Sequence, residues 1–198
     1  MSKSIPILIL AAGSSKRMEG RIKQLLRWKD TTLLKHAIQQ ARLITDNIYI
    51  VLGANADTIK ATIPKEDIVF NPNWKLGIGS SISAGIEFVL KKNQVIDGLL
   101  IMLADQPLLD TSYLKKLMDM FINENPKIVA TAYEERVGVP AIFTFKVLPE
   151  LLNLNEDFGA KNIIKKYRCS TITVQPNGKE IDIDTPNDYS QLIEKMNT

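Results

Sequence analysis

The start of the chain combines small residues with basic residues. The small residues leave the backbone accessible to a ligand, and the basic residues can bind an anion. The stretch Ala11-Ala12-Gly13-Ser14-Ser15 follows the first apolar run, and Arg17 and Lys23 come soon after it. Small residues let backbone N–H groups approach phosphate oxygens, and fixed cations neutralise a polyphosphate. Met18 stands where the second glycine of a Walker loop belongs, and the spacing is not a dinucleotide fingerprint either. The segment from Leu10 to Lys23 therefore predicts a phosphate-binding loop, with a flexible surface turn as the alternative.

Aspartates in two later segments suit a divalent cation. Asp105 comes directly after 98–103, the most hydrophobic run of the chain, where an unpaired carboxylate is poorly solvated. Mg²⁺ binds one or two carboxylates together with phosphate oxygens and would remove that cost. Asp182 and Asp184 are two residues apart, which places them on one face of a strand expected near 180–183. We expect Asp105 to bind Mg²⁺, with a turn cap as the alternative. Asp184 could complete the metal site, although on its own it fits a helix cap ahead of Pro186 better.

Three further features are weaker signals. Gly77 and Gly79 precede a helix expected over 80–92, whose first N–H groups suit a base carbonyl or an anion, although a plain helix cap explains them equally well. His36, the single histidine, falls on a predicted helix and is expected to be structural or solvated. Cys169, the single cysteine, is expected to be a packed or half-exposed thiol rather than a nucleophile.

Apolar runs and helical periodicity alternate along the chain. The expected strands are 5–10, 47–52, 67–70, 98–103, 127–131, 140–144, 171–174 and one near 180–183, with a turn-rich stretch at 133–139. The expected helices are 32–43, 54–63, 80–92, one capped by Asp110, 158–167 and 186–195. Continuous apolar strands between helices indicate a parallel sheet covered on both faces, and the less regular second half indicates some antiparallel pairing. We predict one α/β domain over residues 1–198.

The composition is that of a globular protein, with 45% hydrophobic and 24% charged residues. The net charge of +3 is spread over scattered lysines, so we expect no nucleic-acid binding. The start does not have the pattern of a secretory signal, and no apolar run is long enough to cross a membrane. A single cysteine cannot form an internal disulfide and suits a reducing compartment. These features predict a cytoplasmic protein that acts on something small and does not bind a membrane.

Six motifs in a fixed order resemble one known family. They are Leu10-Ala-Ala-Gly-Ser-Ser-x-Arg-Met with Lys23-Gln-Leu-Leu, Asn71-Pro-x-Trp-x-x-Gly-Ile-Gly-Ser-Ser, Leu103-Ala-Asp-Gln-Pro, Gly138-Val-Pro-Ala-Ile-Phe, Asp157-Phe-Gly-Ala-Lys and Asp182-Ile-Asp-Thr-Pro. Together they resemble the molybdenum cofactor cytidylyltransferase branch of the MobA-like NTP transferase family, from about Ile7 to Tyr189. The resemblance implies a three-layer α/β/α nucleotidyltransferase fold, Rossmann-like and GT-A-like, with a mostly parallel sheet. It also implies Mg²⁺-dependent transfer of CMP from CTP to the terminal phosphate of molybdopterin, with release of pyrophosphate.

The resemblance also implies roles for individual residues. Arg17, Lys23 and Asp105 would be catalytic, and Asp105 and Asp184 would bind the metal. The nucleotide would be bound by Leu10, Ala11, Ala12, Gly13, Ser14, Lys23 and Ser81. The acceptor would be bound by Gly138, Val139, Pro140, Asp157, Gly159 and Lys161. In having alanine at position 12, the sequence resembles the cytidine-using members of the family, whereas the guanylyl enzymes carry glycine there. The sequence departs from the family at Glu19, which precedes Gly20 where glycine usually follows the Arg-Met pair.

The implied partners are CTP and a molybdopterin-type acceptor, with a molybdenum hydroxylase as the recipient of the product. The sequence contains no Ser/His/Asp or Cys/His arrangement, which fits direct in-line attack without a covalent enzyme intermediate. Two alternatives stay open. The first is a nucleotidyltransferase for another nucleotide or acceptor, of the guanylyl or sugar-phosphate type. The second is a non-catalytic protein that delivers the cofactor to a molybdenum enzyme.

Overall fold

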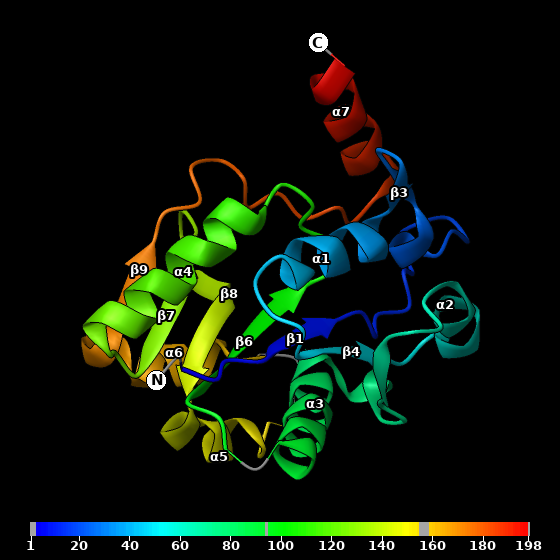
Figure 1. Cartoon of the computed structure of the whole chain (residues 1–198). Helices are drawn as coiled ribbons and strands as arrows, with labels where there is room; N and C mark the ends of the chain where they lie inside the picture. Colours follow the sequence, from blue (N-terminus) through cyan, green and yellow to red (C-terminus); the bar gives the residue numbers. More distant parts are fainter. Residues whose placement is uncertain (1–2, 94, 155–158, 198) are drawn as a thin grey trace.

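A mixed sheet forms the centre of the computed structural model, which describes residues 3–93, 95–154 and 159–197. Within these residues the sheet has seven strands. In spatial order they are β5 (Asp67–Phe70), β4 (Ile48–Leu52), β1 (Ile7–Leu10), β6 (Gly98–Leu103), β8 (Val137–Thr144), β7 (Ile128–Ala132) and β9 (Thr171–Val174). Figure 1 shows β1 in the middle, between β4 and β6. The first half of the chain therefore supplies one side of the sheet and the second half the other.

Among the seven strands of the described residues, one runs opposite to the other six. β5, β4, β1 and β6 are parallel, whereas β8 runs antiparallel to both β6 and β7. The expected mostly parallel sheet with some later antiparallel pairing is confirmed. β8 begins at Val137, earlier than expected, because Tyr133 N–H donates to Arg136 O at 2.8 Å and closes a tight turn. Most of the stretch expected to be turn-rich is thus a short hairpin between β7 and β8.

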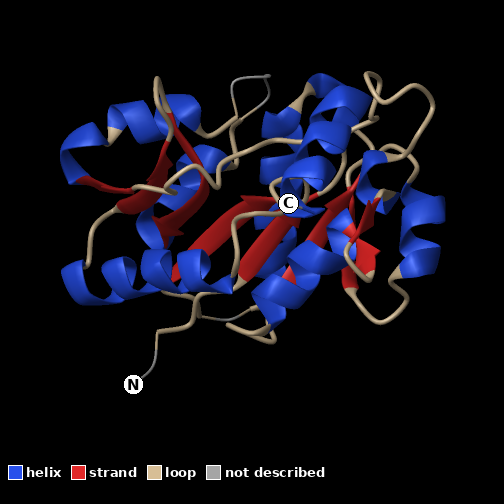
Figure 2. Cartoon of the chain, turned by 90° about the horizontal axis from the view of Figure 1, so that it is seen from above, coloured by secondary structure: helices blue, strands red, loops and turns tan. Residues whose placement is uncertain are grey.

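Helices cover both faces of the sheet, which confirms the three-layer α/β/α arrangement (Figure 1). One face carries α1 (Leu33–Arg42), α4 (Thr111–Glu124) and, beside the edge, α2 (Ala56–Thr62). The other face carries α3 (Ile78–Lys92), α5 (Leu148–Leu151) and α6 (Lys161–Lys166). Figure 2 shows the strands crossing the molecule with helices along both sides. The short 3-10 helices are η1 (Lys23–Leu25), η2 (Trp74–Leu76), η3 (Phe145–Val147) and η4 (Arg168–Ser170), and exposed Cys169 lies in the last of them.

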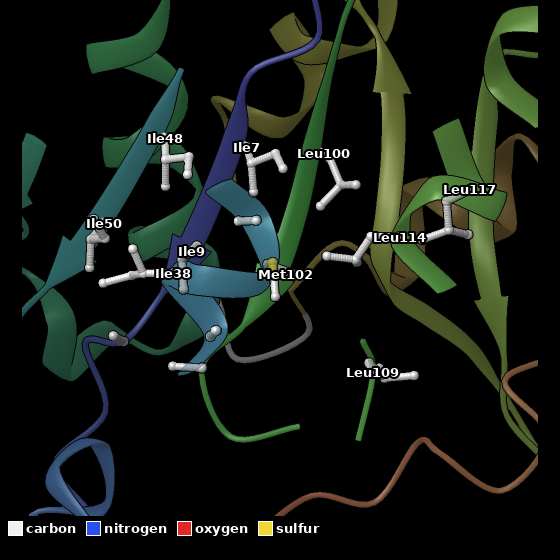
Figure 3. Packing of buried hydrophobic residues seen from close by; sticks show 14 of the residues in the cluster. Ile7, Ile9, Ile38, Ile48, Ile50, Leu100, Met102, Leu109, Leu114 and Leu117 are labelled. Carbon is white, nitrogen blue, oxygen red and sulfur yellow. The ribbon is translucent and has the colours of Figure 1, made fainter. Parts of the chain in front are cut away.

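Side chains of β1 alternate between the two helical layers. Ile7 and Ile9 pack with α1 and α4, whereas Leu8 and Leu10 pack with α3. All four side chains are buried. Figure 3 shows the first of these layers, in which Ile38 of α1 lies over the strands. Because a strand buried on both faces has to be apolar throughout, the continuous hydrophobic run at the start of the chain has a direct structural cause.

A small third cluster lies away from the sheet. Trp28, in the hairpin of β2 (Arg27–Trp28) and β3 (Thr31–Thr32), packs with Leu192 of α7 (Pro186–Asn197). Figure 1 shows α7 next to this hairpin. His36 is buried, its ring centroid is 6.0 Å from that of Trp28, and its Nε2 lies 3.1 Å from Pro107 O. Of the two roles expected for this histidine, structural or solvated, the structure shows the structural one.

The prediction of a strand near 180–183 is wrong. The segment pairs with no strand of the described residues, and the N–H of Ile183 donates instead to the carbonyl of Asp105 at 3.0 Å. The cap predicted at Asp110 is confirmed, since its side chain accepts from Tyr113 N–H at the start of α4. The segment 180–183, whose alternating pattern is typical of a strand, therefore belongs to a loop that crosses the end of β6.

α6 begins at Lys161, whereas the sequence predicted a helix from 158, a position that lies outside the described residues. Along the described parts of the chain, none of the helices combines the length and the apolar character needed to span a bilayer.

Gly85 sets how closely α3 approaches the sheet, which makes it a test of this packing. A Cβ there would lie 2.5 Å from Leu8 Cδ2 and 2.9 Å from Val51 Cγ2, both on buried side chains. We expect Gly85→Ala to lower the free energy of unfolding by about 1–2 kcal/mol, because overpacking costs about 1–3 kcal/mol and helix propensity returns at most about 1 kcal/mol. Urea denaturation measures this change. Gly13→Ala is the matched control, because a Cβ at position 13 meets no heavy atom of the described chain within 4 Å; equal stability of the two variants would contradict the prediction.

Candidate active site

Three segments that are far apart in the sequence meet at one edge of the sheet. Leu10 of β1 is in register with Leu103 of β6, and the N–H of Ala104 donates to Leu10 O at 3.2 Å. The loops after these two parallel strands therefore start side by side. The third segment joins them through the hydrogen bond from Ile183 N–H to Asp105 O. This edge is the carboxyl end of the parallel strands, where open α/β sheets bind their ligands.

A pocket of about 870 Å³ opens at this edge. Its lining is made of Leu10, Ala11, Ala12, Gly13, Ser14, Ser15, Lys16, Arg17, Lys23, Gln24, Trp74, Lys75, Gly77, Ile78, Ser81, Leu103, Ala104, Asp105 and Asp184. Every residue that the sequence assigned to the nucleotide, to the metal or to charge stabilisation is in this set. None of the expected acceptor residues that the structure describes is part of this lining.

The loop after β1 is held in shape by a buried glutamine. Gln24 is 4% exposed, and its Nε2 donates to Ala11 O at 2.9 Å and to Gly13 O at 3.1 Å. The hydroxyl of Ser15 donates to Gln24 Oε1 at 3.3 Å and accepts from Lys23 N–H at 3.0 Å. These bonds make the segment an ordered cradle rather than the flexible turn of the alternative interpretation. Sequence reasoning assigned Gln24 no role, and its only signal was its place beside Lys23.

Two residues of this loop explain its departures from known motifs. Met18, at the position of a Walker glycine, is fully buried and anchors the loop to the protein interior. Glu19 has a φ of 51°, in the left-handed region that favours glycine, and Gly20 follows at 80°. The backbone at Glu19 therefore keeps the glycine-type shape, at a cost of roughly 1–2 kcal/mol. The Glu19 side chain is exposed and is not part of the pocket lining.

Opposite charges are concentrated at the floor of the pocket. The ammonium of Lys23 contacts Asp105 Oδ2 at 2.5 Å and Asp184 Oδ1 at 3.0 Å, and Arg17 contacts Asp184 Oδ2 at 2.9 Å. Burial alone would lower the pKa of Lys23, but the charge of Asp105 and the hydrogen bonds to both aspartates outweigh burial and raise it above its usual value. Lys23 is therefore a permanent cation, and four charged groups from three segments form one network.

The carboxylates of this network fit a divalent cation. Asp105 Oδ1 is buried and, among the described residues, has no hydrogen-bond partner, although Oδ2 of the same group pairs with Lys23. A buried carboxylate oxygen without a partner is costly, and a bound cation removes that cost. The described chain contains no cluster of three or more ligating side chains. The protein would thus supply Asp105 and Asp184, and phosphate oxygens and water would complete the coordination.

The opposite wall of the pocket is the start of α3. Buried Asn71 donates from Nδ2 to the hydroxyls of Ser80 and Ser81, each at 3.0 Å, so that the Ser81 side chain is held in place. Trp74 packs on Gly53, where a Cβ would come within 2.5 Å of Trp74 Cβ and 2.9 Å of Ala12 O. α3 begins at Ile78, two residues before the expected start at 80. Sequence reasoning did not identify the supporting roles of Asn71, Trp74 and Gly53.

A second polar network lies next to the pocket. Buried Gln106 donates from Nε2 to Tyr133 Oη at 2.7 Å and to Asp182 Oδ1 at 2.8 Å, and the Tyr133 hydroxyl donates to Val139 O. Burial, and after it the charge of Asp105, raises the pKa of Asp182 above its usual value. Burial likewise raises the pKa of Tyr133 to about 12. Asp182 thus joins Gln106 while Asp184 joins Lys23, so the expectation that both aspartates lie on one face of a strand is wrong.

Of the residues expected at the acceptor, Val139 belongs to this second network through its carbonyl oxygen. Because β8 runs antiparallel to β6, its first residues, which include Gly138, Val139 and Pro140, lie at the edge where β6 ends. Gly159 is buried near Ile78, since a Cβ there would be 2.9 Å from Ile78 Cγ2. Lys161 is exposed at the first position of α6. The remaining candidate, at position 157, lies outside the described residues.

Several known proteins are similar to this chain in sequence and structure over nearly its whole length. Nicotine blue oxidoreductase of Paenarthrobacter nicotinovorans is 28% identical and aligns over 94% of this chain and 95% of its own. Purine catabolism protein PucB of Bacillus subtilis is 26% identical over 96% of both. The crystal structure of Rv0371c from Mycobacterium tuberculosis is 27% identical, with a TM-score of 0.79 over 98% of this chain and 99% of that one. A structure of the same mycobacterial protein in complex with manganese has a TM-score of 0.78 over 97% of this chain and 99% of that one.

The family of this chain is established by a match along most of its length. Residues 7–171 match the MobA-like NTP transferase domain, and this range contains the small-residue loop, Arg17, Lys23 and Asp105. Asp184 lies after the matched range and reaches the pocket through the loop that crosses the end of β6. The resemblance seen in the sequence motifs is confirmed, and the chain belongs to the MobA-like NTP transferase family.

Proposed function

We propose that this protein transfers CMP from CTP to the terminal phosphate of a molybdopterin-type acceptor and releases pyrophosphate. The observation that carries the proposal is the buried Oδ1 of Asp105, which has no hydrogen-bond partner among the described residues. It lies in a pocket that Arg17, Lys23 and the small-residue loop also line. Such a pocket offers backbone donors and cations for a triphosphate beside carboxylates for a divalent metal. Membership of the MobA-like NTP transferase family supports nucleotidyl transfer as the reaction type.

The reaction requires positioning and charge neutralisation rather than a protein nucleophile. An oxygen of the acceptor phosphate attacks the α-phosphorus, the bond from that phosphorus to the bridging oxygen breaks, and pyrophosphate leaves with the electron pair. Backbone N–H groups of 11–14 would orient the triphosphate, and Arg17 and Lys23 would neutralise its charge. A divalent metal held by Asp105 and Asp184, proposed to be Mg²⁺, would further polarise the phosphates when bound. The manganese complex of Rv0371c supports a divalent metal for this family.

The choice of substrates is inferred from the sequence motifs. Ala12 lines the pocket. Its carbonyl oxygen accepts from the N–H of Ala54, just after β4, at 3.0 Å. Alanine at this position favours CTP by resemblance to cytidine-using members. We place the acceptor against Gly138–Pro140, next to the network of Gln106, and against Gly159 and Lys161. A molybdenum hydroxylase in the cytoplasm would receive the product.

Replacement of Asp105 tests the metal assignment. We expect Asp105→Asn to lower metal-dependent pyrophosphate release from CTP plus molybdopterin about 10³-fold, because metal stabilisation of developing charge contributes several kcal/mol and 1.36 kcal/mol is tenfold in rate. A coupled pyrophosphate assay under anaerobic conditions measures the rate, and a melting curve shows whether the variant is folded. Asp119→Asn, on the exposed side of α4, is the control and keeps full activity. A folded Asp105→Asn enzyme with near wild-type turnover would show that the metal lies elsewhere.

A panel of the four nucleoside triphosphates tests the substrate choice. We expect the wild-type protein to release pyrophosphate fastest from CTP and Ala12→Gly to gain at least fivefold in its GTP-to-CTP ratio. The physical reason is that removal of the methyl group widens the pocket for a larger base. The ratio of kcat/KM values is the measurement. A wild-type preference for GTP would overturn the cytidylyl assignment, and no turnover with any triphosphate would favour the non-catalytic alternative.

Gln24 tests whether loop shape controls nucleotide affinity. Gln24→Leu keeps the size of the side chain but leaves the carbonyls of Ala11 and Gly13 without their buried donor. One such loss costs about 1–3 kcal/mol, and 1.4 kcal/mol is tenfold in affinity, so we expect the Kd for CTP to rise roughly tenfold or more. Isothermal titration calorimetry measures this Kd. Gln39→Leu, at an exposed position of α1, is the matched control, and equal affinities for the two variants would contradict the role of Gln24.

A further inference from the structure

Lys23 lies between the two carboxylates proposed to hold the metal. Its Nζ is 3.0 Å from Asp184 Oδ1 and also binds Asp105 Oδ2. The side chains of Lys23 and Asp105 are only 15% and 20% exposed, so water screens this contact poorly. A single ammonium thus bridges both acidic groups at the floor of the pocket, a position suited to a divalent cation.

The charges of this cluster already balance. Asp105 and Asp184 contribute two negative charges, and Lys23 and Arg17 contribute two positive charges. A divalent cation added alone would give a half-buried cluster a net charge of two and would have to approach the ammonium of Lys23. A nucleoside triphosphate brings several negative charges, which more than offset the two positive charges of the metal. Lys16 and Lys75, which also line the pocket, supply further cations for these phosphates. Electrostatics therefore favours joint binding over binding of the metal by itself.

The side chain of Lys23 is built to exchange one anionic partner for another. Its backbone N–H is fixed by the hydroxyl of Ser15, at 3.0 Å, so the base of the side chain stays in place. Lysine carries a compact charge on a flexible four-carbon stem with rotatable donors, which lets the ammonium move while its backbone does not. The small-residue loop that would hold the phosphates lines the same pocket. The ammonium can thus leave the carboxylates for phosphate oxygens.

We propose that Lys23 is an internal counter-cation that keeps the divalent metal out until a triphosphate draws its ammonium away from Asp105 and Asp184. Metal and nucleotide consequently bind together, and the carboxylates are never left uncompensated. This inference rests on the proposed function for the identity of the triphosphate. It does not depend on turnover, because its direct consequence is weak binding of the metal by the wild-type protein in the absence of nucleotide.

Binding of Mn²⁺ to the full chain, followed by electron paramagnetic resonance without nucleotide, tests the proposal. We expect Lys23→Met to bind Mn²⁺ at least tenfold more tightly than the wild-type protein, because the competing ammonium is gone. Lys23→Arg keeps the charge and should stay within threefold of wild type. Lys60→Met, which removes an exposed lysine of α2, controls for net charge and should also stay within threefold. Equal or weaker Mn²⁺ binding by Lys23→Met would overturn the proposal.

A second measurement covers the case in which Lys23→Met folds poorly because its carboxylates repel each other. We expect Mn²⁺ to raise the melting temperature of Lys23→Met, or of Lys23→Gln, more than that of the wild-type protein. No larger rise in either variant would overturn the proposal. Tight Mn²⁺ binding by Lys23→Met together with no turnover of any triphosphate would leave Lys23 as the counter-cation and remove only the proposed function.

Discussion

The parallel pairing of β1 with its neighbours β4 and β6 is the constraint on which the pocket depends. Because β1 is buried on both faces and in register with both neighbours, the three chains leave the sheet at one edge. The loop after β1, Gly53 after β4 and Asp105 after β6 therefore meet there, although they are distant in sequence. A shift of one residue in this register would move the side chains of β1 to the opposite helical layer and separate the loop from Asp105.

Buried polar side chains give this edge its shape. Gln24 satisfies the carbonyls under the small-residue loop, Asn71 holds Ser81, and Gln106 joins Tyr133 to Asp182. Each is at most 4% exposed, so its bonds are shielded from competing water. Three amides thus place the surrounding groups before any ligand arrives, which is what a reaction driven by positioning and charge neutralisation requires.

The reversal of strand direction at β8 divides the site into two parts. The parallel strands supply the small-residue loop and Asp105, whereas β8 brings Val139 to the same edge because it runs the other way. Gln106 follows Asp105 directly and, through Tyr133, reaches the carbonyl of Val139. The proposed nucleotide and acceptor regions are therefore joined by side-chain hydrogen bonds across the strand reversal.

The sequence by itself determined the features that arise from local patterns. Buried strands have to be apolar on both faces, so their positions, the α/β class and the loop after the first strand could be read from the order of residues. It did not determine which distant groups meet. The alternation at 180–183 resembles a strand, yet the N–H of Ile183 found its acceptor at Asp105, and this separated Asp182 from Asp184. Likewise, only the tertiary structure joined Lys23 to two carboxylates, because burial and charge pairing depend on chain segments that no local pattern brings together.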